Sequence, residues 1–245
     1  MPADFEKTLI VMPAWNEEDS IQTVIAAVYL ALPGVHCLVV DDGSTDDTAR
    51  MARSAGAMVA SLPFNLGVGG AMRLGYKFAR DNGYRVVVQI DADGQHNPED
   101  APALIAALAD ADIVIGARFA GVGDYKTHGP RRWAMRLLSG VLSRVAGTKL
   151  TDTTSGFRAS GPKAIRIFAE NYPAEYLGDT IEALVIASRA GCRLVQVPVA
   201  MKPRIAGTAS QGSIKSTLYL ARVAVSLIFA LVRPTSSYRG ERGLI

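Results

Sequence analysis

The stretch Arg85–His96 (RVVVQIDADGQH) contains the pattern on which the prediction of the fold rests. Its first half, Arg85–Asp91, is a short run rich in β-branched apolar residues, which is typical of a strand buried on both faces. The run ends at the carboxylate of Asp91, and the carboxylate of Asp93 and the amide of Gln95 follow it. In an open parallel sheet, ligands bind at the carboxyl ends of the strands. This stretch therefore predicts a buried strand that leads into a ligand site.

The segments on either side repeat an alternation of strands and helices. Four more buried strands are predicted, at Thr8–Pro13, His36–Asp41, Ala57–Ser61 and Asp112–Gly116. Helices are predicted between them: one after an N-cap at Asn16, one over Thr48–Ala55, one from the glycine-rich turn Asn65–Gly70 to Arg80, and one over Glu99–Leu108. This alternation predicts an α/β fold, in which a parallel sheet carries helices on both faces.

Beyond Gly116 the alternation becomes less regular. The sequence predicts a basic helix over Arg131–Val145 and a polar turn over Thr151–Arg158. Two further helices are predicted over Pro162–Glu170 and Asp179–Ala190, and a strand over Arg193–Val199. Pro198 favours a place at the sheet edge for the strand, because proline donates no hydrogen bond to a neighbouring strand.

Composition excludes several classes of protein. The chain has 245 residues, of which 49% are hydrophobic and 20% charged, so disordered and fibrous classes do not fit. The net charge of +3 is too small to indicate a nucleic-acid binder. Two cysteines, with no metal-ligand spacing, favour a reduced, intracellular setting, and the first residues do not resemble a secretory signal. The apolar stretch Thr217–Val232 contains Arg222 and is shorter than the roughly 20 apolar residues of a membrane span.

Acidic residues follow three of the predicted strands and should meet at one crevice. Asp91 and Asp93, with Gln95 as a third oxygen donor, suit Mg²⁺ or Mn²⁺, which prefer oxygen ligands and often share them with substrate phosphates. Asp41 and Asp42 can accept hydrogen bonds from a ribose or a nucleobase. The competing interpretation is that each pair merely caps a turn or a helix.

Five motifs in this order resemble those of the family 2 glycosyltransferases: Pro13–Glu17 (PAWNE), Asp41–Ser44 (DDGS), Asn65–Gly70 (NLGVGG), Asp91–His96 (DADGQH) and Thr154–Arg158 (TSGFR). The resemblance covers roughly residues 8–210 and is greatest to the polyprenyl-phosphate sugar synthases, typified by dolichol-phosphate mannose synthase. It implies a GT-A fold, which is Rossmann-like, with a mostly parallel sheet. It also implies residues 1–210 as the catalytic domain.

The resemblance assigns roles to individual residues. It implies Asp91, Asp93 and Gln95 as ligands of Mg²⁺ or Mn²⁺, and Asp93, Asp152 and Glu182 as residues of the reaction centre. Residues implied to contact the nucleotide sugar are Pro13, Trp15, Glu17, Asp41, Asp42, Asp91, Ala92, Arg118 and Arg204. Residues implied to bind an acceptor phosphate are Arg131, Arg132, Arg136 and Ser139. Gly178 and Ser210 stand where mannose synthases can carry lysines, which leaves the nucleotide open between UDP and GDP.

The implied reaction is an inverting transfer of a sugar from a nucleotide sugar to a polyprenyl phosphate. Two alternatives remain open at this point: transfer to a sugar hydroxyl, with Asp152 or Glu182 as the base, and a non-catalytic nucleotide-binding module. We expect residues 211–245 to form an amphipathic helix and tail that contact the membrane surface, a second copy or a membrane protein. The resemblance therefore places the chain in the cytoplasm, peripherally on the cytoplasmic face of the membrane.

Overall fold

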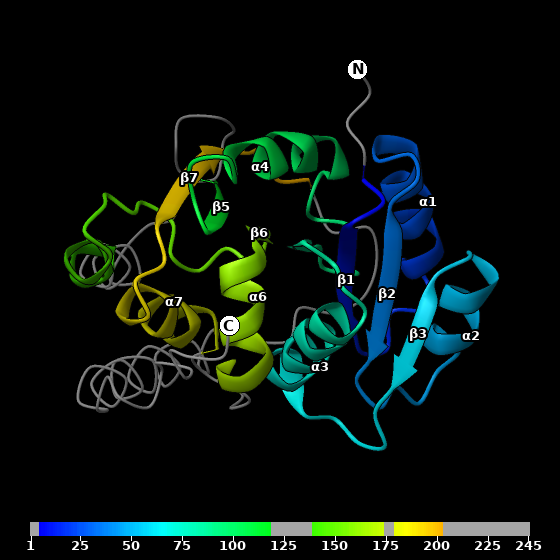
Figure 1. Ribbon diagram of the computed structural model, residues 1–245. Coiled ribbons are helices and arrows are strands. Elements are labelled where there is room, and N and C mark those ends of the chain that lie inside the picture. The colour runs from blue at the N-terminus through cyan, green and yellow to red at the C-terminus, as the bar shows by residue number, and fades with distance from the viewer. Residues whose placement is uncertain (1–4, 119–138, 174–178, 203–245) are drawn as a thin grey trace, which may run out of the picture.

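The computed structural model describes residues 5–118, 139–173 and 179–202 (Figure 1). Its centre is a seven-stranded sheet in the order β3-β2-β1-β4-β6-β5-β7. The strands span Thr8–Ala14 (β1), His36–Asp41 (β2), Met58–Ser61 (β3), Val86–Gln89 (β4), Ile113–Ala117 (β5), Arg158–Ser160 (β6) and Leu194–Pro198 (β7). All neighbouring strands are parallel except β6, which runs antiparallel to both β4 and β5. The fold is therefore α/β with a mostly parallel sheet, as predicted.

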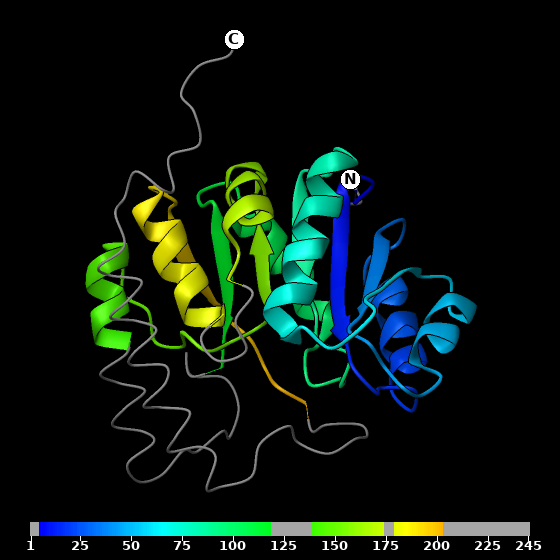
Figure 2. The same ribbon diagram turned by 90° about the horizontal axis from the view of Figure 1, so that it is seen from below.

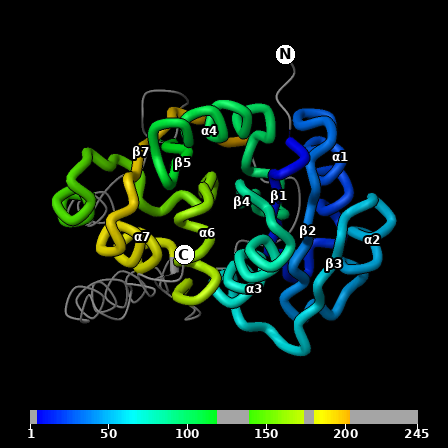
Figure 3. Tube along the Cα trace, in the orientation of Figure 1, coloured from blue at the N-terminus to red at the C-terminus, as the bar shows by residue number. Residues whose placement is uncertain are grey.

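Helices cover both faces of the sheet. They are α1 (Ile21–Ala31), α2 (Thr48–Ser54), α3 (Gly67–Asp81), the 3₁₀ turn η1 (Pro98–Asp100), α4 (Ala101–Ala107), α6 (Pro162–Asn171) and α7 (Asp179–Arg189), and residues 139–146 are also helical. In Figure 3, α3, α6 and α7 lie on one side of the sheet and α4 on the other. Seen from below, α3, α6 and α7 stand in front of the strands (Figure 2).

The strands β1, β2, β4 and β5 are buried on both faces because each contributes to two separate cores, whereas β3 is the edge strand and is half exposed, contrary to the prediction of a buried strand there. Leu9 and Val11 of β1 pack with α3, α6 and α7, whereas Ile10 and Met12 pack with α1 and α4. All four side chains are fully buried. Alternation of side chains across a strand explains why every second residue enters the other core. The continuous apolar runs in the sequence are thus the signature of a sheet between two helical layers.

The antiparallel strand β6 is the feature that the sequence did not predict. Its first residue, Arg158, pairs with Gln89 near the end of β4 and with Ile115 near the end of β5. The segment that enters β6, residues 151–157, therefore lies at the edge where the parallel strands end. This segment was predicted to be a polar turn, because a strand of three residues is too short to show an alternation of apolar and polar side chains.

Other differences are small, except at the start of α1. The predicted N-cap at Asn16 is wrong, because α1 begins at Ile21 after Ser20. Asn16 instead adopts a left-handed conformation with a φ of 53°. The edge position of β7 is confirmed by the strand order. The predicted C-terminal helix within residues 211–245 lies outside the described residues. Within the described ranges, no helix combines the length and apolar character needed to cross a membrane.

Close packing of α3 on β1 gives a prediction for stability. A Cβ atom on Gly75 would press into the side chain of Val11. Overpacking a tight core costs about 1–3 kcal/mol, more than the roughly 1 kcal/mol that alanine gains over glycine in a helix. We expect Gly75→Ala to lower the free energy of unfolding in urea by about 1 kcal/mol or more.

The double variant Gly75→Ala/Val11→Ala is the matched test of this contact. It removes the side-chain atoms against which the new methyl group presses, so the two losses should not add. Additive losses in the free energy of unfolding would contradict the proposed contact between α3 and β1.

Candidate functional site

The carboxyl edge of the sheet gathers most of the predicted site residues. Pro13, Asp41, Asp91 and Arg118 lie within or directly after β1, β2, β4 and β5 respectively. Parallel strands bring these positions to the same edge. The loops that follow the strands are tied to one another by hydrogen bonds, so the edge is a connected structure.

The first two of these loops are joined through backbone amides and side chains. The amide of Asn16 donates to Ser44 Oγ at 3.0 Å, and the amide of Glu17 donates to Thr48 Oγ1 at 2.8 Å. Asp41 accepts from the amide of Ser44 through Oδ1 at 3.0 Å. Trp15 projects from this pair of loops with 48% of its surface exposed. Ala14 pairs with Asp41 in register, so the exposed aromatic side chain of Trp15 and the carboxylate of Asp41 come from the same end of two neighbouring strands.

Asp42 holds the glycine-rich turn. Its Oδ1 and Oδ2 accept hydrogen bonds from the amides of Leu66 and Gly67, both at 2.7 Å. Burial raises the pKa of Asp42 above its ordinary value, although the two amides act in the opposite direction. Gly43 belongs to the same packing, because a Cβ atom there would lie 2.7 Å from the backbone of Phe64. Asp42 thus fixes the start of α3 at the edge of the sheet where the predicted nucleotide-binding residues lie.

The loop after β4 is shaped by its own side chains. His96 accepts the amide hydrogen of Asp91 through Nδ1 at 3.1 Å, and its ring stacks on Phe157 with centroids 4.9 Å apart. Asp93 accepts from the amide of Gln95 through Oδ1 at 2.9 Å. The carbonyl of Gln95 accepts from the amide of Lys202, which connects this loop to the segment after β7. Ala92 is buried between the two aspartates.

This loop offers a divalent cation an incomplete set of oxygen donors. Two carboxylates and one amide oxygen come from Asp91, Asp93 and Gln95. Among the described residues, no group of three His, Cys, Asp or Glu side chains is placed to hold a metal. Magnesium characteristically uses one or two carboxylates and takes its other ligands from water and substrate phosphates. The donor set fits a cation that binds together with a diphosphate.

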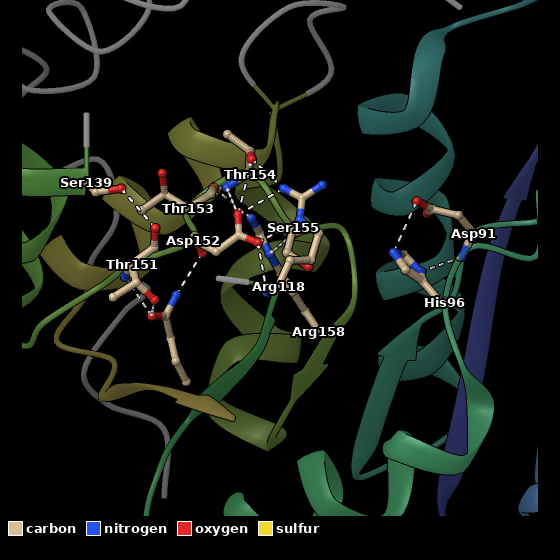
Figure 4. A network of polar contacts seen from close by, with 11 residues as sticks. Asp91, His96, Arg118, Ser139, Thr151, Asp152, Thr153, Thr154, Ser155 and Arg158 are labelled. Carbon is tan, nitrogen blue, oxygen red and sulfur yellow. Dashed lines mark hydrogen bonds and ion pairs between the residues drawn. The ribbon is translucent and has the colours of Figure 1, made fainter. Parts of the chain in front are cut away.

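Arg118 and Asp152 form a buried ion pair across the site (Figure 4). Arg118 Nε and Nη2 reach Asp152 Oδ2 and Oδ1 at 2.6 and 2.9 Å, and the amide of Arg118 also donates to Oδ2 at 3.1 Å. Arg118 Nη2 donates in addition to Thr154 Oγ1 at 2.6 Å. The side chain of Asp152 is fully buried, and that of Arg118 is 17% exposed.

The environment of Asp152 determines its charge. Burial acts to raise its pKa, but the hydrogen bonds and the positive charge of Arg118, with the amide of Thr154, hold the pKa below its ordinary value. Asp152 is therefore a carboxylate at neutral pH. A carboxyl group of lowered pKa whose two oxygens already accept hydrogen bonds is a poor proton acceptor.

Neighbouring side chains fix the loop that carries Asp152. Gln196 of β7 donates to the carbonyl of Asp152 at 2.7 Å and accepts from the amide of Thr151 at 2.7 Å. Arg158 is buried, and its guanidinium donates to the carbonyls of Ser155, Thr180 and Thr153. The buried cation joins this loop to the start of α7.

The remaining predicted residues divide into described and undescribed ones. Ser139 lies at this site, since its hydroxyl donates to the carbonyl of Thr151 at 3.4 Å (Figure 4). Glu182 lies on α7, two residues after Thr180, and is partly buried. Glu17 is partly buried at the edge. Four predicted site residues lie outside the described residues: Arg131, Arg132 and Arg136, predicted to bind the acceptor phosphate, and Arg204, predicted to contact the nucleotide sugar.

Three supporting residues were missed from the sequence. Gln196 clamps the Asp152 loop, and Gln89 and Gly156 lie against Asp91, as described below. Gln89 could have been singled out from the sequence, because it is a polar residue within the apolar run of β4. Gly156 lies within the motif Thr154–Arg158, but no role was assigned to it from the sequence, and Gln196 carries no comparable signal.

With this geometry in hand, comparison with known proteins identifies the class. The family model described as "Glycosyl transferase family 2" matches residues 9–169, and the chain belongs to this family. The resemblance seen in the sequence motifs is thereby confirmed.

Several characterised proteins are similar to this chain. An undecaprenyl-phosphate mannosyltransferase of Micrococcus luteus is 31% identical over 208 residues, which cover 82% of this chain and 86% of the relative. A polyprenol monophosphomannose synthase of Mycolicibacterium smegmatis is 34% identical over 162 residues, or 63% of this chain and 61% of the relative.

Solved structures support the fold. Glucosyl-3-phosphoglycerate synthase of Mycobacterium tuberculosis, in complex with Mn²⁺, UDP and glucosyl-3-phosphoglycerate, superimposes with a TM-score of 0.71 at 24% identity. The match covers 93% of this chain and 80% of that one. The described sheet is thus shared with a glycosyltransferase despite low identity.

The ion pair predicts a specific dependence of stability on pH. The lowered pKa of Asp152 means that its contribution is present above the unfolded pKa of about 3.9 and is lost as the pH falls through the lower folded value. We expect Asp152→Asn to cost about 3 kcal/mol at pH 7, because the largely buried guanidinium of Arg118 loses its counter-charge. The deficit should shrink below about pH 4.

Urea unfolding of wild type and variant across this pH range measures the effect. Asp110→Asn, at an exposed aspartate, is the control and should change little. A variant as stable as wild type at pH 7 would contradict the buried pair.

Proposed function

We propose that this chain transfers a sugar from a nucleoside-diphosphate sugar to a polyprenyl phosphate, with inversion at the anomeric carbon. The observation that carries the proposal is the meeting, at one sheet edge, of the Asp91–Asp93 loop and the anchored guanidinium of Arg118. A leaving diphosphate needs positive charge as the bond to the sugar breaks. Arg118 after β5 and a cation held by the Asp91–Asp93 loop after β4 would supply that charge.

The donor half of the site is assigned from the first two loops and the loop after β4. Trp15, Asp41 and Asp42 would hold the nucleoside, and Asp91, Asp93 and Gln95 would hold Mg²⁺ or Mn²⁺ on the diphosphate. When bound, such a cation neutralises charge on the leaving group. The similar synthase of Mycobacterium tuberculosis is described in complexes with UDP and Mn²⁺, and another with Mg²⁺, which supports a divalent cation here.

The acceptor is assigned from the chemistry of Asp152. A hydroxyl acceptor needs a base near the nucleophile, whereas a phosphate monoester already carries an anionic oxygen at neutral pH. Asp152 is poorly suited to accept a proton because its pKa is lowered and Arg118 and the Thr154 amide occupy its oxygens. We assign Asp152 as the positioning residue of Arg118. An acceptor that brings its own negative charge is the better match to a site that offers cations.

The relatives support a lipid carrier of that phosphate. Besides the two polyprenyl-phosphate enzymes above, a UDP-N-acetylglucosamine–dolichyl-phosphate N-acetylglucosaminyltransferase of Methanococcus voltae is 28% identical over 210 residues. That match covers 78% of this chain and 83% of the relative. We place Ser139 beside the acceptor phosphate, together with Arg131, Arg132 and Arg136. A lipid acceptor also places the reaction at a membrane surface, and we propose the cytoplasmic face.

Product analysis tests the proposal directly. Labelled UDP- and GDP-sugars are incubated with the protein, Mg²⁺ or Mn²⁺, and either polyprenyl phosphate or soluble sugars. We expect label to enter the organic phase only with the lipid phosphate and the cation. Asp93→Asn should reduce the rate by about 100-fold or more, since metal-assisted charge stabilisation is worth several kcal/mol.

Glu99→Gln is the matched control, because Glu99 is an exposed carboxylate close to the same loop. It should transfer sugar at the wild-type rate. Transfer to soluble hydroxyls without lipid phosphate would overturn the acceptor assignment and favour Glu182 as a base. Wild-type turnover by Asp93→Asn would overturn the cation assignment.

A further inference from the structure

We infer that Gln89 and Gly156 form a cradle that positions the carboxylate of Asp91 for its cation. This inference rests on the proposed function, because it concerns the cation that Asp91 and Asp93 would hold. Neither residue belongs to the set of oxygen donors. Their effect is on the direction in which the Asp91 side chain points.

Gln89 acts through a hydrogen bond from within the sheet. It is the last residue of β4 and is 4% exposed, and its Nε2 donates to Asp91 Oδ1 at 3.1 Å. A buried amide that donates to one carboxylate oxygen limits rotation of that carboxylate. Asp91 itself stays accessible, with 37% of its side chain exposed. The carboxylate is therefore held from behind while one side stays open to a ligand.

Gly156 faces Asp91 because of the register of β6. Gln89 pairs with Arg158 in antiparallel register. Continued two residues past the end of β4 and two residues before the start of β6, this register places Asp91 opposite Gly156. The amide of Gly116 donates to the carbonyl of Phe157 at 2.9 Å, so β5 confines the same segment from its other side.

The absence of a side chain at Gly156 is what leaves room for this arrangement. A Cβ atom there would lie 2.9 Å from Gln89 Nε2, 3.1 Å from Asp91 Oδ2 and 3.4 Å from Asp91 Oδ1. Gly156 is not among the glycines with positive φ, so its backbone conformation is open to alanine. Glycine is needed at this position because a side chain would enter the space that Gln89 Nε2 and the carboxylate oxygens of Asp91 occupy.

This geometry separates an effect on the cation from an effect on folding. The three atoms nearest to a methyl group at residue 156 all lie at the ends of the Gln89 and Asp91 side chains, which can rotate away while the backbone stays in place. The fold should survive, and the carboxylate of Asp91 should turn from its cation-binding direction. Altered partners of metal ligands typically weaken metal binding 10- to 100-fold.

Mn²⁺ binding is the measurement that tests the cradle. The signal of free Mn²⁺ in electron paramagnetic resonance is titrated with protein in the presence of UDP, and separately of GDP. We expect Gly156→Ala to raise the dissociation constant of Mn²⁺ about tenfold. Gln89→Met, which keeps the length of the side chain but removes the donor, should weaken binding in the same direction. The double variant should lose less than the product of the two single effects, because both act on Asp91.

Gly161→Ala is the matched control. Gly161 also has a negative φ, at −83°, and its added Cβ would meet only ordinary contacts at 3.5 Å or more. It should bind Mn²⁺ as wild type does. Thermal unfolding of the metal-free Gly156→Ala protein should stay within a few degrees of wild type, and raising Mn²⁺ tenfold should restore its sugar transfer.

The outcomes separate the cradle from the proposed function. If wild type binds Mn²⁺ and Gly156→Ala binds equally well, the cradle is wrong and the function stands. If Gly156→Ala is unfolded, it shows no thermal transition, and its weak Mn²⁺ binding has no bearing on the cradle. The test then rests on Gln89→Met, and unchanged Mn²⁺ binding by this variant overturns the cradle. If wild type binds no Mn²⁺ with either nucleotide, the proposed function fails and the cradle with it.

Discussion

The antiparallel strand β6 is the constraint on which the site depends. Parallel strands alone bring the loops after β1, β2, β4 and β5 to one edge, but they leave a gap between β4 and β5. Because β6 fills this gap in the opposite direction, the segment entering it, residues 151–157, arrives at that same edge. It touches the loop after β4 through Gly156 and the end of β5 through Asp152. One short reversal of direction thus joins the two halves of the site.

The charges at this edge are held in place before any ligand arrives. Arg118 is fixed by two oxygens of Asp152 and by Thr154, and Asp42 is fixed by two backbone amides. Groups oriented in this way need little reorganisation when charge develops on a leaving group. The carboxylates after β4 are different, because within the part of the chain that the structure describes no third acidic, histidine or cysteine side chain joins them to complete a cation site. We expect the oxygens of a bound diphosphate to supply the remaining ligands of a cation at these carboxylates.

Much of this architecture could be predicted from the sequence, and the exceptions have physical causes. The long apolar runs predicted β1, β2 and β4 closely, because strands buried on both faces leave a strong signal. Strand β6 was not predicted, because three residues are too few to show the alternating hydrophobic pattern of a strand. The N-cap at Asn16 was wrong because its side chain bonds to Thr45 of a neighbouring loop, a contact that no local pattern contains. The pairing of Arg118 with Asp152 and the cradle around Asp91 are likewise contacts between distant residues.

The central claim is that the side chains of Asp91 and Asp93 bind a divalent cation on the diphosphate of a nucleotide sugar. Diffraction at the manganese absorption edge, from crystals grown with Mn²⁺ and UDP or GDP, tests it most directly. The account predicts an anomalous peak between these two carboxylates and the diphosphate oxygens. A bound nucleotide diphosphate with no anomalous peak near either aspartate would contradict it.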